Sequence, residues 1–304
     1  RRTERHPGLG HPAAAGLARG QGNAEVGHQR AAIVQQDVLR LDVAVDDALA
    51  VGGLEALAQL VLGLAGDLFV REEDRALVGL VEAGTAPLEI LSKYNTVRLT
   101  CQPGDCFTYQ NTMFNIITPA IEKASGNSYA EELHRYILDP LGLTTTSVGK
   151  AGLTSTGNWA RPHRRKGDSW YAVPVTDPYY KVPAAGGVNS SINDLAKWMI
   201  AQMGERPDVL AADVLDNAHR KRISTPSESS RTRSLKLPVK ATYYGLGWRT
   251  YDYAGHKLIN HSGSVEGYFA QIAWLPEKRA GIVVLTSHQS VALDDAVPQV
   301  ALTL

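Results

Sequence analysis

The stretch Lys257-Leu-Ile-Asn-His-Ser-Gly-Ser-Val-Glu-Gly-Tyr-Phe-Ala-Gln-Ile-Ala-Trp-Leu-Pro276 has the pattern of a strand, a turn and a second strand. At its centre lies a polar tetrapeptide that contains glycine, His261–Ser264. Such a segment on an edge strand can line a cleft and offer backbone N–H groups to a reacting carbonyl. We therefore expect His261–Ser264 to form one wall of a site at the edge of a sheet.

Further strand candidates, rich in aromatic and β-branched residues, surround this stretch and lie at 243–253, 256–260, 268–275 and 281–287. The turn signal Pro276–Arg279 predicts an antiparallel hairpin between the last two. The aromatic stripe of Trp248, Tyr251 and Tyr253 is interpreted as packing on the sheet and not as a platform for sugar rings.

Helix signals precede the strands. Apolar spacing predicts a helix over Thr112–Ala124 that is kinked at Pro119 and stopped by Gly126. Three more helices are expected: one from the capping box at 128–131 to about 138, closed by Pro140; one from 191 to 203, stopped by Gly204; and a short one near 209–219. Residues 141–177 and 220–240 are predicted to be irregular, and a loop as long as the first is usually functional or covers a site.

Helices followed by a strand meander predict an α+β fold, in which an antiparallel sheet packs against helices and a mostly helical subdomain. The predicted domain covers residues 91–304, with helices and loops over 91–240 and antiparallel strands over 241–290.

Residues 1–90 differ in composition from the rest, because they contain no Lys, Ser, Tyr, Trp or Cys and all their basic side chains apart from His are Arg. One interpretation is an Ala/Leu-rich helical domain, since 43–64 and 74–81 carry apolar residues at roughly helical spacing. The alternative is that the segment is not native coding sequence, because GC-rich DNA read in a wrong frame or strand gives this composition.

Composition excludes several classes of function. The formal net charge of the 304 residues is zero, which gives no support to nucleic-acid binding or to a polybasic membrane contact. No apolar stretch reaches the roughly 20 residues of a membrane span. The chain begins with Arg and has no signal-peptide pattern, so we expect a fragment or a processed form.

Two cysteines, Cys101 and Cys106, cannot alone make a zinc site, and no metal is expected. They form either a local disulfide across the intervening Pro-Gly turn, in an oxidising compartment, or two free thiols.

Tyr109-Gln110-Asn111 lies just before the first clear helix. A Tyr and an Asn two apart at a helix start can project into one cleft, where the phenol moves a proton and the amide holds a carbonyl. The alternative is that Tyr109 and Asn111 simply cap the helix.

Taken together, the ordered segments resemble the serine hydrolases of the class C β-lactamase and D,D-peptidase type, which also include many esterases. The matching pieces are Pro103-Gly-Asp-Cys-Phe-Thr-Tyr-Gln-Asn111; Ala124-Ser-Gly-Asn-Ser-Tyr-Ala-Glu-Glu-Leu133 with Ile137-Leu-Asp-Pro-Leu-Gly-Leu-Thr-Thr-Thr146; Val182-Pro-Ala-Ala-Gly-Gly-Val-Asn-Ser-Ser-Ile-Asn-Asp-Leu-Ala-Lys-Trp-Met199; Tyr244-Gly-Leu-Gly-Trp248; and Asn260-His-Ser-Gly-Ser-Val-Glu-Gly-Tyr268. The resemblance covers about residues 91–290.

The resemblance implies acyl transfer through an acyl-serine, with no metal and no cofactor. It implies that Tyr109 is the general acid/base and Asn111 the amide that orients the substrate. It also implies that His261, a catalytic residue, forms an anion-facing or proton-relay wall with Ser262, and that Ser262 and Gly263 bind the substrate. The backbone N–H of Ser264 would be half of the oxyanion hole. The implied partner is a small-molecule or peptide substrate, and the implied location is periplasmic or secreted.

The family's nucleophile is the serine of a Ser-x-x-Lys motif well upstream of Tyr-x-Asn, but this chain has no serine before Ser92 and no lysine before Lys93. Its one Ser-x-x-Lys, Ser147-Val-Gly-Lys150, follows Tyr-x-Asn and lies in a segment that does not favour a helix. We therefore expect Ser147 not to be the nucleophile, the N-terminal part of the fold to be absent or replaced, and the C-terminal hairpin to have an uncovered edge.

Three functions stay open. The first is hydrolysis of a β-lactam, peptidoglycan peptide or small ester by a member of this family, in a chain that has lost its nucleophile. The second is a non-catalytic relative that binds an acyl or peptidoglycan-like ligand. The third is an unrelated α+β scaffold protein.

Overall fold

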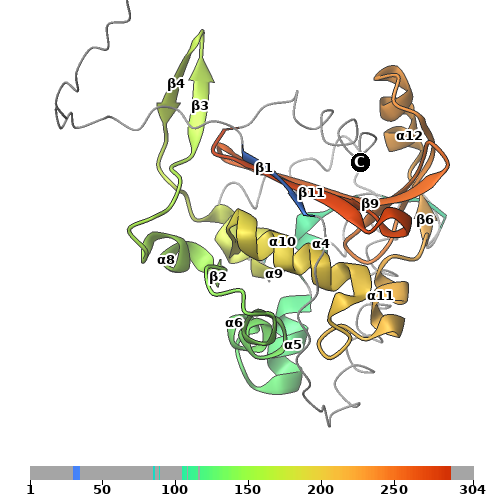
Figure 1. The fold of residues 1–304 in the computed structure, drawn as a ribbon. Helices are drawn as coiled ribbons and strands as arrows, with labels where there is room; N and C mark the ends of the chain where they lie inside the picture. Colours follow the sequence, from blue (N-terminus) through green and yellow to red (C-terminus); the bar gives the residue numbers. More distant parts are fainter. Residues whose placement is uncertain are drawn as a thin grey trace, which may run out of the picture.

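The computed structural model describes residues 30–34 (backbone only), 85, 89, 105–107, 109–115 and 117–288. In this part of the chain the main feature is an antiparallel sheet with strand order β1-β11-β10-β9-β8-β7-β6. Its strands are β1 (Arg30–Val34), β6 (Ile223–Ser224), β7 (Val239–Tyr244), β8 (Arg249–Tyr253), β9 (His256–Val265), β10 (Tyr268–Leu275) and β11 (Ala280–Thr286). Helices lie along the sheet, so the predicted α+β class is confirmed (Figure 1).

The segment 243–253, predicted as one strand, is two. β7 ends at Tyr244 and β8 begins at Arg249, and the turn between them is closed by a bond from Gly245 N–H to the carbonyl of Trp248 at 2.7 Å. Gly247 has φ +73°, a conformation that glycine adopts without strain. The two glycines therefore mark a hairpin turn that β-propensity alone did not show.

The predicted hairpin between the last two strands is confirmed, since β10 and β11 pair in register from Phe269↔Thr286 to Leu275↔Ala280. The 3₁₀ turn η6 (Pro276–Lys278) joins them.

The strand that carries His261–Ser264 is not an edge strand, which corrects the prediction. β9 pairs with β10 as far as Tyr268↔Val265, but its pairing with β8 ends at Arg249↔Asn260. The second half of β9 therefore extends past β8 and is a local edge inside a larger sheet. This local edge can still leave backbone groups available to a cleft.

The predicted uncovered edge of the C-terminal hairpin is also wrong. β1 pairs antiparallel with β11, in register from Arg30↔Leu285 to Val34↔Gly281. A short piece of the compositionally distinct N-terminal segment thus belongs to the sheet. The remainder of the expected domain at residues 1–90 lies almost wholly outside the described residues.

The helices are mostly short. They are α4 (Asn111–Phe114), α5 (Ile117–Ser125), α6 (Tyr129–Leu133), η3 (His134–Leu138), α7 (Asp139–Leu141), α8 (Gly149–Thr154), η4 (Pro178–Lys181), α9 (Pro183–Gly186), α10 (Ile192–Ile200), η5 (Ala201–Glu205), α11 (Ala212–Ala218) and α12 (Pro226–Ser234). The predicted capping box at the start of α6 is present, because Ser128 and Glu131 bond reciprocally.

Two prolines act differently from each other. The predicted helix over 112–124 is interrupted between α4 and α5, since Pro119 cannot bond to the carbonyl of Asn115 four residues back. Pro140 does not close its helix as predicted. It lies at the start of α7, where a missing N–H costs little, and the chain leaves the helix only at Gly142, with φ 63°.

The two regions predicted to be irregular contain regular structure. Residues 141–177 include α8, the strand β2 (Ser147–Val148), and the hairpin of β3 (His163–Lys166) and β4 (Ser169–Ala172); β2 pairs with β5 (Val188–Asn189). Residues 220–240 include α12, whose polar sequence has no apolar periodicity to reveal it. β2 and α12 are held by partners distant in sequence, whereas β3 and β4 form a local hairpin around Gly167 and Asp168.

Apolar side chains pack on both faces of the sheet. On one face Met199 of α10 packs against Ile259 and Trp274, and Figure 1 shows α10 running along this face. On the other face the cluster includes Leu258 and Leu275, with α12 at the end of the sheet near β6. Trp248, Tyr251 and Tyr253 are 8%, 4% and 0% exposed, so the packing interpretation of this stripe is confirmed.

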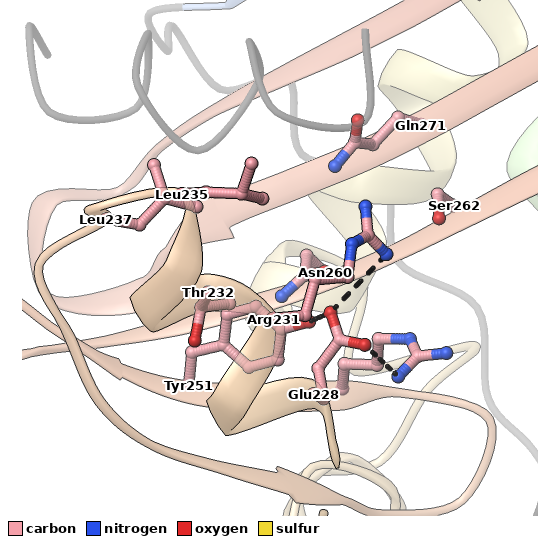
Figure 2. Close-up of a pocket in the computed structure, with 10 residues that line it drawn as sticks. Glu228, Arg231, Thr232, Leu235, Leu237, Tyr251, Asn260, Ser262 and Gln271 are labelled. Carbon is pink, nitrogen blue, oxygen red and sulfur yellow. Dashed lines mark hydrogen bonds and ion pairs between the residues drawn. The ribbon is translucent and has the colours of Figure 1, made fainter. Parts of the chain in front are cut away.

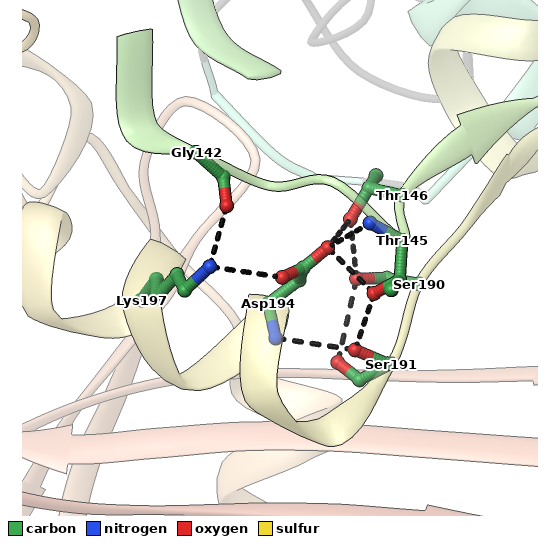
Figure 3. A network of polar contacts seen from close by, with 7 residues as sticks. All are labelled: Gly142, Thr145, Thr146, Ser190, Ser191, Asp194 and Lys197. Atoms are coloured by element: carbon green, nitrogen blue, oxygen red, sulfur yellow. Dashed lines mark hydrogen bonds and ion pairs between the residues drawn. The ribbon is translucent and has the colours of Figure 1, made fainter. Parts of the chain in front are cut away.

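A buried carboxylate ties α10 to the segment before β2 (Figure 3). Asp194 is 2% exposed, and its Oδ2 accepts bonds from Thr145 N–H at 2.8 Å, Thr145 Oγ1 at 2.7 Å and Thr146 Oγ1 at 3.1 Å. Lys197 contacts the other oxygen at 3.4 Å.

Among the described residues no helix is long and apolar enough to cross a membrane.

Candidate active site

Three aromatic rings from distant parts of the sequence meet beside the free half of β9. Tyr109 precedes α4, Tyr244 ends β7 and His261 lies on β9. The ring centroid of Tyr109 is 6.2 Å from that of Tyr244 and 5.9 Å from that of His261. The structure thus brings together the predicted pair Tyr109 and His261, at a junction of the helical region and the sheet.

His261 is held in a defined orientation. Its Nε2 lies 3.0 Å from the hydroxyl of Tyr244, and its ring also bonds to the backbone of Ser262. Burial, together with the charge of Arg249, lowers the pKa of His261 to about 4, although the bond to the Ser262 backbone acts in the opposite direction. His261 is therefore neutral near pH 7. The hydroxyl of Tyr244, whose pKa is raised by burial, stays protonated and donates a hydrogen bond to His261 Nε2.

Tyr109 is a protonated phenol in this setting. Its ring packs near Phe114 as well as Tyr244 and His261, and although 39% of its surface is exposed, desolvation raises the pKa of Tyr109. The guanidinium of Arg249 acts in the opposite direction, with its Cζ 5.9 Å from the ring centroid. At neutral pH Tyr109 can donate a proton, but it needs further positive charge nearby before it can accept one.

The other predicted residues occupy different positions around this junction. Asn111 is the first residue of α4, and its backbone carbonyl accepts the N–H of Asn115 at 3.0 Å. Its place at the helix start fits both the substrate-orienting and the capping interpretation. Gly263 has open space beside it, since a Cβ there would meet no atom within 4 Å. Ser264 is exposed, opposite Phe269 of β10.

Ser262 does not share a wall with His261, because successive side chains of a strand point to opposite faces. Ser262 lines a polar cavity on the α12 side of the sheet, with Asn260 and Gln271. The expectation that His261 and Ser262 form a single wall is corrected in this respect.

The Ser147 and Lys150 side chains are not paired. Ser147 is on the short strand β2, where its Oγ lies 3.4 Å from Asn189 Nδ2, and Lys150 is on α8 and forms an ion pair with Asp177 at 3.1 Å. A serine nucleophile needs a base within hydrogen-bond reach, and Lys150 is engaged elsewhere.

Comparison with known proteins identifies the family of the chain. The Beta-lactamase family profile matches residues 31–303. The chain belongs to the Beta-lactamase family. The match begins inside the N-terminal segment of unusual composition and covers the whole of the described sheet except the first residue of β1.

Individual relatives are distant. The chain is 24% identical over 228 residues to "Unguisins hydrolase ungD" of Aspergillus violaceofuscus, covering 69% of this chain and 40% of the relative. It is 25% identical over 204 residues to "D-alanyl-D-alanine-carboxypeptidase/endopeptidase AmpH" of Escherichia coli K12, covering 64% of this chain and 48% of the relative. The chain therefore spans less than half the length of these curated relatives.

Among solved structures, the octameric penicillin-binding protein homologue from Pyrococcus abyssi has a TM-score of 0.65 and 24% sequence identity, covering 81% of this chain and 55% of that chain. At this identity the likeness shows the fold alone.

Two residues of the candidate site, Tyr244 and Arg249, are assigned no role by the sequence motifs. The two are direct partners in the register of β7 and β8, and Arg249 lies with its Cζ 5.6 Å from the Tyr244 ring centroid. The signal that could have found them is the hairpin turn between them, which places its two flanking residues side by side.

Cys106 is disulfide-bonded, which agrees with the bridged alternative; Cys101, the only other cysteine in the sequence, lies outside the described residues. Within the described residues no group of three or more His, Cys, Asp and Glu side chains could hold a metal ion.

Proposed function

We propose that this protein descends from hydrolases that cleave an amide or ester bond by acyl transfer, and that the junction of Tyr109, Tyr244 and His261 supplies the proton-transfer and carbonyl-binding half of such an active site. The main support for this proposal is that Tyr109 and His261 lie side by side at the free half of β9, with their ring centroids 5.9 Å apart. The family match and the names of the relatives, which include hydrolases of peptides, support the reaction class.

The roles follow from the chemistry of acyl transfer. A serine hydroxyl attacks the substrate carbonyl, its proton passes to a base, and the leaving group takes a proton from an acid. Tyr109 is proposed as the group that moves this proton, Asn111 as the amide that orients the substrate, and the backbone N–H of Ser264 as one oxyanion-hole donor. Losing one such donor typically lowers the rate by about 10²–10³.

The nucleophile is the missing component. No serine precedes Ser92 in the sequence, and Ser147 and Lys150 have separate partners. We therefore propose that this chain binds its ligand without forming an acyl-enzyme. This second function is that of a non-catalytic protein that binds an acyl or peptidoglycan-like ligand.

Covalent labelling tests the proposal. The purified chain is incubated with a fluorophosphonate probe and with a labelled penicillin, and the intact mass is measured. We expect no adduct. An adduct would overturn the claim that no nucleophile is present, and its loss in Ser147→Ala, but not in the exposed control Ser169→Ala, would assign it to Ser147.

Reversible binding separates the two functions from an unrelated scaffold. A substrate-like acyl-D-amino acid amide should shift the ring resonances of His261 in an NMR titration, and Tyr109→Phe should weaken this binding. If neither the ligand nor the variant affects His261, the proposed cleft is wrong.

We further propose a periplasmic or secreted location. The disulfide at Cys106 supports it, since such bonds persist in oxidising compartments. Cell fractionation tests the location, and recovery of the protein with free thiols in the cytosolic fraction would contradict it.

A further inference from the structure

A small polar cavity lies on the α12 side of the sheet, at the level of Ser262 (Figure 2). Its volume is about 40 Å³. β9 contributes Asn260 and Ser262, the neighbouring β10 contributes Gln271, and α12 contributes Glu228 and Arg231. The cavity shares Arg249 and Ser262 with the candidate active site, but none of the three rings that meet at Tyr109 lines it.

The register of the sheet places these polar side chains together. Gln271 is directly opposite Ser262 in the pairing of β9 and β10, and Asn260 lies two residues from Ser262 on the same face. Most of that face is apolar, with Leu258 and Tyr253 fully buried. A patch of amides on such a face requires polar partners, because an unpaired buried amide is costly.

Two of these amide atoms have no hydrogen-bond partner among the described residues. They are Asn260 Nδ2 and Gln271 Oε1, and each residue is only 4% exposed. One atom is a donor and the other an acceptor. Native structures satisfy nearly all such groups, so the pair indicates a ligand that can accept one hydrogen bond and donate another.

The charged groups of the cavity lining contact one another. Glu228 lies 3.8 Å from Arg231 and 3.7 Å from Arg249, and it accepts a hydrogen bond from the Tyr251 hydroxyl at 2.7 Å. Two guanidinium groups thus face one carboxylate, so the lining keeps an excess of positive charge. The amide atoms of Asn260 and Gln271 that have no partner among the described residues are neutral, and they present one donor and one acceptor.

We propose that this cavity binds a primary carboxamide group. The carboxamide oxygen accepts from Asn260 Nδ2, and its N–H donates to Gln271 Oε1. A water molecule needs roughly 10–15 Å³ of such volume, so the cavity holds about three or four non-hydrogen atoms, the size of a carboxamide and its attached carbon. A carboxylate has the same shape but no N–H for Gln271.

Acetamide and acetate, which are nearly isosteric, provide the test. The full ¹⁵N-labelled chain is titrated with each at equal ionic strength, and the side-chain amide resonances of Asn260 and Gln271 are followed by NMR. We expect acetamide to give saturable shifts and acetate to bind at least tenfold more weakly. The buried amide of Gln202, which bonds to His219 at 2.8 Å, is the internal control and should not move.

Two variants identify the side-chain atoms that bind acetamide. Gln271→Leu should abolish the shift of the Asn260 amide, and if this variant fails to fold, Asn260→Asp serves instead, because it exchanges the donor for an acceptor. Equal binding of acetate would overturn the proposal in favour of an oxyanion site. Absence of saturation with both probes would also overturn it and leave a cavity filled by water. Neither result bears on Tyr109, which the labelling and His261 titrations test separately.

Discussion

Replacing Asp194 by Ala should destabilise the protein by about 3 kcal/mol. Three hydrogen bonds end on its Oδ2, from Thr145 N–H, Thr145 Oγ1 and Thr146 Oγ1, at 2.8, 2.7 and 3.1 Å (Figure 3). In the variant the two hydroxyls keep other partners, since Thr145 Oγ1 lies 2.6 Å from Ser191 Oγ and Thr146 Oγ1 lies 2.8 Å from Ser190 Oγ.

The cost therefore has three parts. The N–H of Thr145 loses a charged acceptor, and because Thr145 is exposed, water can replace that acceptor and the loss costs about 1 kcal/mol. Loss of the charge-assisted bonds from the two hydroxyls adds roughly 1–2 kcal/mol, because both bonds are replaced only in part. The contact with Lys197, whose side chain is 48% exposed, adds at most about 1 kcal/mol.

Urea unfolding at pH 7, followed by circular dichroism, measures this loss. The matched control is Asp168→Ala, since the Asp168 side chain is fully exposed and its ion pair with Arg165 lies at the surface. The control should change the free energy of unfolding by less than about 0.5 kcal/mol. A loss for Asp194→Ala no larger than for the control would refute the reasoning that this network holds α10 to the segment before β2.

The same network makes a pH-dependent contribution. Burial would raise the pKa of Asp194, but the hydrogen bonds from Thr145 and Thr146 outweigh burial and lower the pKa below its ordinary value. The folded-state pKa is thus below the unfolded one, so the stabilisation is fully present above about pH 4 and is lost as the pH falls through the folded-state value. The difference in stability between wild type and Asp194→Asn should shrink over that acidic range.

Three further predictions concern other parts of the chain. Arg249→Met should raise the pKa of both His261 and Tyr109, because the guanidinium lowers both pKa values. NMR titration of the imidazole and ultraviolet titration of the phenol measure the shifts. An unchanged pKa of His261 would contradict the assignment. Ser128→Ala should cost about 1 kcal/mol in urea unfolding through loss of the capping box, and no loss would mean that α6 is held by packing alone. The genomic DNA upstream of codon 91, read in all frames and on both strands, should encode a Ser-x-x-Lys motif; if none is found, the misread-segment interpretation fails and the non-catalytic binding protein becomes the leading function.

The sequence predicted the parts of the fold that local chemistry controls. The capping box at Ser128, the turn after Pro276 and the burial of Tyr253 each follow from residue types within a few positions of one another. The short elements β2 and α12 were not predicted, because partners distant in sequence hold them. α12 is polar, and it packs through Thr232, which is 3% exposed, and through a bond from Ser229 to Thr242 at 2.7 Å.

The same division holds for the candidate site. Tyr109 and His261 were selected from motifs, and the structure brings them together although they are far apart in sequence. The role of Arg249 depends on the β7–β8 register, which no motif encodes. The opposite orientations of His261 and Ser262 could have been predicted from strand alternation, since the segment was already expected to be a strand.

The electrostatics around Tyr109 and His261 indicate that the lysine of a Ser-x-x-Lys motif would matter as much as its serine. His261 is neutral near pH 7, so the cation of the described site is Arg249, and Glu228 at 3.7 Å offsets part of its charge. Tyr109 consequently keeps its proton near pH 7, and in this state it can act as an acid. A lysine one helical turn from the nucleophile would add the positive charge that lowers the pKa of a neighbouring phenol. Restoring a serine alone should therefore give a poorly activated nucleophile, whereas restoring a Ser-x-x-Lys helix should activate both the serine and Tyr109.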